Sequence, residues 1–132
     1  MSPVALWIKP SVEFSAQLVG FEAARRDNWA AAEQAYRFGL GVSSEDPGLN
    51  LNLGVALDHR GMNSEAEDVY RRAASLQPAS PNPWRNLGTL FWKQGRWLEA
   101  GSAFERARSL APDDKSLGEF ASEAARRARG RP

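Results

Sequence analysis

The chain has 132 residues, of which 42% are hydrophobic and 25% charged, proportions typical of an ordinary soluble protein. Its formal net charge of +1 provides no global field toward nucleic acid or an acidic membrane. The absence of cysteine excludes a disulfide framework and thiolate metal sites, and the length predicts one domain or one short solenoid.

Residues 1–12 are predicted to form an irregular N-terminal tail that contains Trp7. Its apolar run Val4–Ile8 is shorter than a secretory signal requires, and Lys9 and Pro10 interrupt it. No window approaches the roughly 18 apolar residues of a membrane span. We therefore expect a cytoplasmic protein without membrane insertion.

Helical periodicity and short loops predict helices over residues 11–26, 28–42, 47–60, 63–77, 81–94, 97–110 and 114–129. No strand pattern is present. Two helix starts combine a capping side chain with proline at the first helical position, Asp46-Pro47 and Ser80-Pro81. The last helix has one apolar and one charged face, which suits the open end of a helical stack.

Residue types recur at a spacing of 34 positions. The most regular unit contains Trp84, Leu87, Gly88, Phe91, Gly95, Ala100, Phe104, Ala107 and Pro112. The corresponding places one unit earlier hold Asn50, Leu53, Gly54, Leu57, Gly61, Ala66, Tyr70, Ala73 and Pro78. The first unit diverges, with Ala16, Val19, Gly20, Ala23, Asp27, Ala32, Tyr36, Gly39 and Ser44.

This pattern resembles the tetratricopeptide repeat (TPR) over residues 13 to about 114. The resemblance implies an all-α, right-handed solenoid of three TPR-type helix pairs plus a C-terminal capping helix. The implied units are a divergent repeat 1 (13–46), repeat 2 (47–80), repeat 3 (81–114) and a capping helix with a basic end (115–132).

Glycines in this pattern predict two kinds of backbone geometry. Gly61 and Gly95 suit the left-handed residue that ends a helix. Gly54 and Gly88 lie inside helices, where each costs about 1 kcal/mol relative to alanine. We expect a partner helix to approach closely at both places, through Ala66 and Ala100 respectively.

Catalytic chemistry is not indicated, so we expect no enzyme, no cofactor and no metal site. His59 is the only histidine, and the adjacent Asp58 points about 100° away on the same helix. The sequence has no phosphate-binding loop and no metal-ligand spacing. Arginines near the C-terminus, such as Arg126 and Arg127, are interpreted as a solvated helix end and not as a nucleic-acid site.

In the family that the sequence resembles, the first helix of each pair lines a concave groove. Helical geometry then gives the expected partner-binding residues. They are Phe14, Gln17, Phe21 and Arg25 in unit one, Asn52, Val55, Asp58 and His59 in unit two, and Asn82, Arg85, Asn86, Thr89, Trp92 and Lys93 in unit three. Trp92 does not coincide with a core position of the repeat and is expected to be exposed.

Asn52 and Asn86 are 34 residues apart, and in the family asparagine at this place often bonds the backbone of an extended peptide. The alternative is that these asparagines cap or bridge neighbouring helices. Family members that bind a C-terminal carboxylate hold it with lysine and arginine. Asn52 matches one position of that clamp, but the other positions hold Gln17, Phe21, Asn82 and Asn86, so the basic residues are missing. A chaperone tail ending in EEVD is therefore not expected as the ligand.

The resemblance thus predicts a protein–protein interaction adaptor or scaffold that binds a peptide segment or helix of another protein. The alternative is a subunit or dedicated assembly chaperone of a larger complex. Such a protein could self-associate through the N-terminal tail or the open first repeat, so a homo-oligomer is possible.

Overall fold

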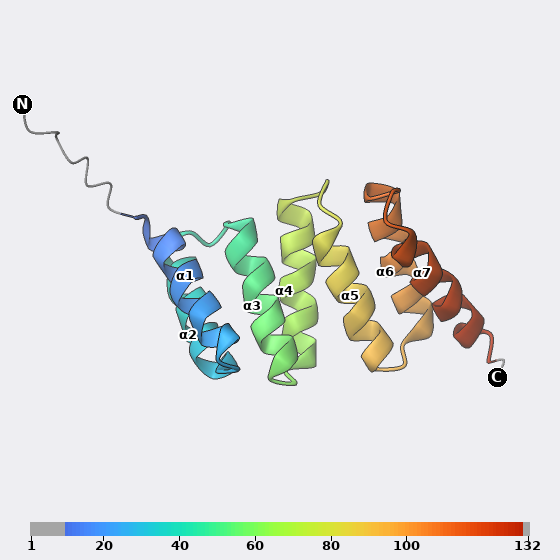
Figure 1. Cartoon of the computed structure of the whole chain (residues 1–132), viewed down its shortest axis with the longest axis horizontal. Helices are drawn as coiled ribbons and strands as arrows, with labels where there is room; N and C mark the ends of the chain where they lie inside the picture. The colour runs from blue at the N-terminus through green and yellow to red at the C-terminus, as the bar shows by residue number, and fades with distance from the viewer. Residues whose placement is uncertain (1–9, 131–132) are drawn as a thin grey trace, which may run out of the picture.

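The computed structural model describes residues 10–130, which form seven α-helices and no strand (Figure 1). The helices are α1 (Val12–Arg25), α2 (Trp29–Val42), α3 (Pro47–His59), α4 (Asn63–Leu76), α5 (Asn82–Lys93), α6 (Trp97–Leu110) and α7 (Lys115–Ala128). Each begins and ends within one residue of its predicted position. Most of the predicted tail lies outside the described residues, but Val12 already belongs to α1.

The helices follow one another along the long axis of the molecule, with α1 and α2 at one end and α7 at the other (Figure 1). Each helix packs mainly on its neighbours in sequence. In addition α1 contacts α3 and α3 contacts α5, so that these first helices form one continuous row. The predicted all-α repeat solenoid is therefore confirmed. Among residues 10–130, no helix has both the length and the apolar character needed to cross a bilayer.

Local signals set the helix ends as predicted. The Asp46 side chain accepts a hydrogen bond from the Leu49 backbone N–H at 2.9 Å, and Pro47 occupies the first turn of α3. Gly61 and Gly95 have φ values of +75° and +71°, the left-handed geometry that glycine adopts without a steric penalty. The chain therefore reverses sharply between the two helices of each pair.

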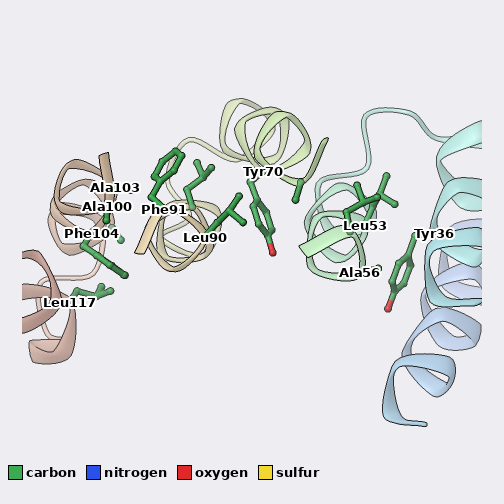
Figure 2. Close-up of a cluster of buried hydrophobic side chains, with 14 of the residues drawn as sticks. Tyr36, Leu53, Ala56, Tyr70, Leu90, Phe91, Ala100, Ala103, Phe104 and Leu117 are labelled. Carbon is green, nitrogen blue, oxygen red and sulfur yellow. The ribbon is translucent and has the colours of Figure 1, made fainter. Parts of the chain in front are cut away.

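The helix pairs are packed through contacts between a glycine and an aromatic ring. A Cβ atom added at Gly54 would lie 2.6 Å from the Tyr70 ring, and one added at Gly88 would lie 2.7 Å from the Phe104 ring. Figure 2 shows Tyr70 and Phe104 among the buried side chains. The prediction that Ala66 and Ala100 make the close approach is wrong. These alanines are buried, but the atoms nearest to the two glycines belong to the aromatic rings of Tyr70 and Phe104.

Two glutamates 34 residues apart join successive helix pairs. Glu33 of α2 accepts a hydrogen bond from Arg60, which directly follows α3. Glu67 of α4 accepts one from Arg96, which directly precedes α6, at 2.7 Å. A glutamate–arginine ion pair therefore links the first pair to the second and the second to the third, although the two arginines are at different places of the repeat.

At the third equivalent place the sequence has Gly101, and there α7 covers the stack. A Cβ atom at Gly101 would lie 3.6 Å from the Cβ of Ala124 in α7. Leu117, Ala121 and Ala124 are buried against the last pair. The amphipathic last helix thus covers the C-terminal end of the core, as its sequence pattern predicts.

Candidate functional site

The row of α1, α3 and α5 carries all the residues expected to bind a partner, and none of them is fully buried. The exposed ones are Phe14, Phe21, Arg25, His59, Asn82, Thr89 and Lys93. The half-buried ones are Gln17, Asn52, Val55, Asp58, Arg85, Asn86 and Trp92. We call this surface the inner row.

At the α1 end the inner row is strongly apolar. Phe14, Leu18 and Phe21 follow the i, i+4, i+7 spacing of one helix face and are 60%, 53% and 59% exposed. Val55 on the neighbouring α3 is half-buried and also apolar. Leu18 is not among the residues that the sequence analysis expects to bind a partner, although the same spacing would have placed it on this face. A group of large exposed apolar side chains commonly marks an interaction surface.

The spaced asparagines lie further along the inner row. Asn52 and Asn86 are both half-buried on this surface. Asn50, by contrast, is buried and donates hydrogen bonds to the Ser44 and Asp46 carbonyl oxygens at 3.1 and 2.8 Å. Asn50 is therefore a structural amide, whereas Asn52 and Asn86 are half-buried on the inner row.

The basic side chains of the inner row are held in ion pairs. Lys93 donates to Asp58 at 2.6 Å, across α5 and α3. Arg85 donates to Asp114 at 2.8 Å, and Arg25 to Glu22 at 2.9 Å.

Two titrating groups reflect these surroundings. The Ser116 hydroxyl, with a smaller contribution from Arg85, lowers the pKa of Asp114 below its usual value. Burial, with a smaller contribution from Asp58, raises the pKa of the Tyr70 phenol. Asp114 therefore stays ionised and keeps Arg85 paired at neutral pH.

His59 lies at one edge of the inner row and stacks on a tryptophan. Its ring is parallel to that of Trp29 in α2, with the ring centroids 3.8 Å apart and an interplanar angle of 3°. The Trp29 indole N–H donates to Asp27 at 2.6 Å. Since Asp58 pairs with Lys93, His59 and Asp58 do not form the orienting pair that general-base chemistry needs.

Trp92 is not exposed, which corrects the sequence-based expectation. Its ring meets Trp97 edge-on with the centroids 5.1 Å apart, and it meets Phe120 of α7 at 5.9 Å. The Arg127 guanidinium lies 4.8 Å from the centroids of both tryptophan rings. Trp92 therefore helps to hold α5, α6 and α7 together. Arg127 packs on these rings instead of forming only a solvated end.

Within residues 10–130, no group of three or more histidine or acidic side chains is arranged to hold a metal ion. The inner row thus offers apolar surface, paired charges and four side-chain amides, those of Gln17, Asn52, Asn82 and Asn86.

Comparison with known proteins gives a family and a fold. The tetratricopeptide repeat model matches residues 22–83 and 65–115, which together are more than half of the chain. No curated protein sequence matches significantly.

Solved structures with low sequence identity are similar in fold. The TPR2B domain of yeast Sti1, in its complex with pHsp70, has a TM-score of 0.81 at 18% identity, covering 88% of this chain and 98% of that chain. The second TPR domain of human RPAP3, in complex with the HSP70 peptide SGPTIEEVD, has a TM-score of 0.79 at 21% identity. The match covers 86% of this chain and 95% of that chain. The type III secretion translocator chaperone SycD of Yersinia enterocolitica has a TM-score of 0.76 at 16% identity, covering 90% of each chain.

Proposed function

Because the chain belongs to the tetratricopeptide repeat family, we propose that it is a non-catalytic adaptor that binds a segment of another protein along the inner row. The observation that carries this proposal is the exposed stripe of Phe14, Leu18 and Phe21, which continues toward the half-buried amides of Asn52 and Asn86. The binding unit would be the three helix pairs, residues 13–46, 47–80 and 81–114, with residues 115–132 as its cap.

The chemistry of the inner row favours a particular ligand. Apolar side chains of a peptide or helix would pack on the α1 stripe, and the asparagine amides would bond peptide groups whatever the side chains. The Sti1 and RPAP3 domains are described with Hsp70 peptides. In this chain Arg85 and Lys93 are neutralised by Asp114 and Asp58. We therefore propose an internal, apolar segment as the ligand instead of an acidic C-terminal tail.

The test is to capture partners with the full chain, identify them by mass spectrometry and titrate the leading one. Replacing Asn52 and Asn86 with Ala removes hydrogen bonds worth about 0.5–1.5 kcal/mol each, so the affinity should fall about ten- to a hundredfold. Gln77→Ala, at an exposed amide between α4 and α5, is the matched control and should leave the affinity unchanged.

Circular dichroism of the same variants separates the possible causes. An intact fold with lost binding supports the inner row. An intact fold with full binding would show that the partner contacts another surface of the protein. A lost fold would show that the asparagines are structural.

A second proposed function is a subunit or dedicated assembly chaperone that associates with copies of itself. The observation that favours it is the exposure of Val19, Phe38 and Val42, which lie in the first helix pair but outside the inner row. SycD, which has a similar fold, is described as a translocator chaperone in an alternative dimer. Size-exclusion chromatography with light scattering decides between them, because a monomer at micromolar concentration would argue against self-assembly.

We also propose a cytoplasmic location. Cell fractionation with an antibody against the protein tests this, and recovery from a membrane or secreted fraction would contradict it.

A further inference from the structure

A second apolar surface lies at the N-terminal end of the stack, on a different side of α1 from the inner row. Val12, Ala16 and Val19 of α1 face Ala35 and Phe38 of α2 across a groove of about 530 Å³, which Pro10 also lines. At about 100° per residue, Val12, Ala16 and Val19 lie roughly 150° around the helix from Phe14, Leu18 and Phe21. We call this surface the end groove.

Within residues 10–130, no helix covers the end groove. Val19 and Phe38 are 60% and 70% exposed, whereas Leu53, at the place of Val19 in the second pair, is buried under the first pair. At the opposite end of the stack α7 covers the corresponding core. No charged side chain lines the end groove, so an apolar segment could occupy it without desolvating a charge.

We propose that the N-terminal run Val4–Ile8 of the same chain packs in the end groove and covers the first helix pair. The run contains five consecutive apolar residues and is joined to the groove-lining Pro10 by Lys9 alone. Five extended residues span about 16 Å. The helix from Val12 to Val19 is about 10 Å long, so a run that reverses direction at Lys9 and Pro10 covers the whole groove.

The tether favours occupancy by the same chain over a second copy. A short linker gives an effective concentration of about 1 mM, roughly a hundredfold above that of a second copy at about 10 µM protein. This inference concerns a surface separate from the inner row and does not rest on the adaptor function. It competes with the second proposed function, because the run would cover Val19 and Phe38 within one chain.

Cysteine cross-linking of the full chain tests the proposal, and it is clean because the sequence has no cysteine. One variant combines Ala5→Cys with Phe38→Cys in the end groove. Its matched control combines Ala5→Cys with Phe14→Cys, which is 60% exposed on the other side of α1 and nearer to the tail in sequence. Under mild oxidation, we expect the Phe38 pair to close within one chain at least tenfold faster than the Phe14 pair. Adding Trp7→Asp should abolish this preference.

Three outcomes overturn the proposal. Closure of the Phe14 pair as fast as the Phe38 pair would show an undocked tail that samples both sides of α1. Predominant disulfide-linked dimers would show that a second copy fills the end groove. No closure of either pair would place the run elsewhere. Circular dichroism checks the fold, and Gln34→Cys, at another exposed lining residue, replaces Phe38→Cys if that variant does not fold.

Discussion

At the scale of single residues, a hydrogen atom in place of a side chain decides how closely two helices approach. Gly54 and Gly88 each lie beneath an aromatic ring of the following helix, at a distance that no Cβ atom tolerates. The cost of glycine inside a helix, about 1 kcal/mol, is offset by the burial of Tyr70 or Phe104. The repeat therefore depends on the pairing of a glycine with an aromatic residue.

Gly88→Leu should lower the stability by about 1–3 kcal/mol or more, because the new side chain overlaps the Phe104 ring. A circular dichroism melt should show a clear fall in Tm. Gly41→Leu is the matched control, since no atom lies within 4 Å of a Cβ added at this helical position. Its Tm should stay the same or rise, because leucine forms helix better than glycine. Equal melting temperatures for the two variants would contradict the observed packing.

At the scale of elements, α7 does more than cover apolar surface. Its Glu123 accepts hydrogen bonds from Arg126 and Arg127 of the same helix, and Arg127 also lies over Trp92 and Trp97. The position of α7 on the last pair is thus coupled to the ionisation of one carboxylate.

Acid should loosen α7 in a defined pH range. The Arg126 and Arg127 guanidinium groups lower the pKa of Glu123 from its ordinary 4.5 to about 2. A lowered folded-state pKa stabilises the fold at pH values above the unfolded pKa, and that stabilisation is lost as the pH falls from 4.5 to about 2. Glu123→Gln should therefore lower the Tm at pH 7. The difference in Tm between this variant and the native protein should disappear near pH 2.

Glu119→Gln serves as the control for this titration, because Glu119 lies on α7 without an ion pair among residues 10–130. At pH 7 its Tm should differ less from that of the native protein than the Tm of Glu123→Gln does. A Glu123→Gln variant with the same profile as Glu119→Gln would show that these arginine contacts contribute nothing to the docking of α7.

At the scale of the whole molecule, contacts between neighbouring helices dominate, and few contacts reach beyond them. Each pair is therefore stabilised by its own packing and by its neighbours, as in other repeat proteins. The first pair has a neighbour on one side only within the described residues. Its α1 buries just Ala16 and Gly20.

The rate of amide hydrogen exchange should reflect this difference in packing between the first pair and the rest of the stack. We expect α1 to exchange at least tenfold faster than α5, which buries Leu87, Leu90 and Phe91 and packs between α4 and α6. Mass spectrometry of peptides from the two helices under identical conditions measures the difference. Equal protection of α1 and α5 would show that the stack opens as a single cooperative unit.

The sequence by itself determined the helices, their ends and their repetition. Asp46 caps α3, and Gly61 and Gly95 end helices, because these effects act within a few residues of the backbone. The spacing of 34 residues then determined the solenoid, because a helix pair that cannot bury its own apolar face must stack on the next. The inner row follows from the same periodicity, although its role as a binding site is a proposal.

Only the tertiary structure decided which atoms meet across helices. It placed Phe104, and not Ala100, against Gly88, because the reach of an aromatic side chain depends on its rotamer and on the crossing of two helices. It buried half of Trp92 under α7, a helix more than 20 residues away along the chain. It also left Val19 and Phe38 exposed, since what covers a residue depends on whether a neighbouring pair is present and not on its own place in the repeat.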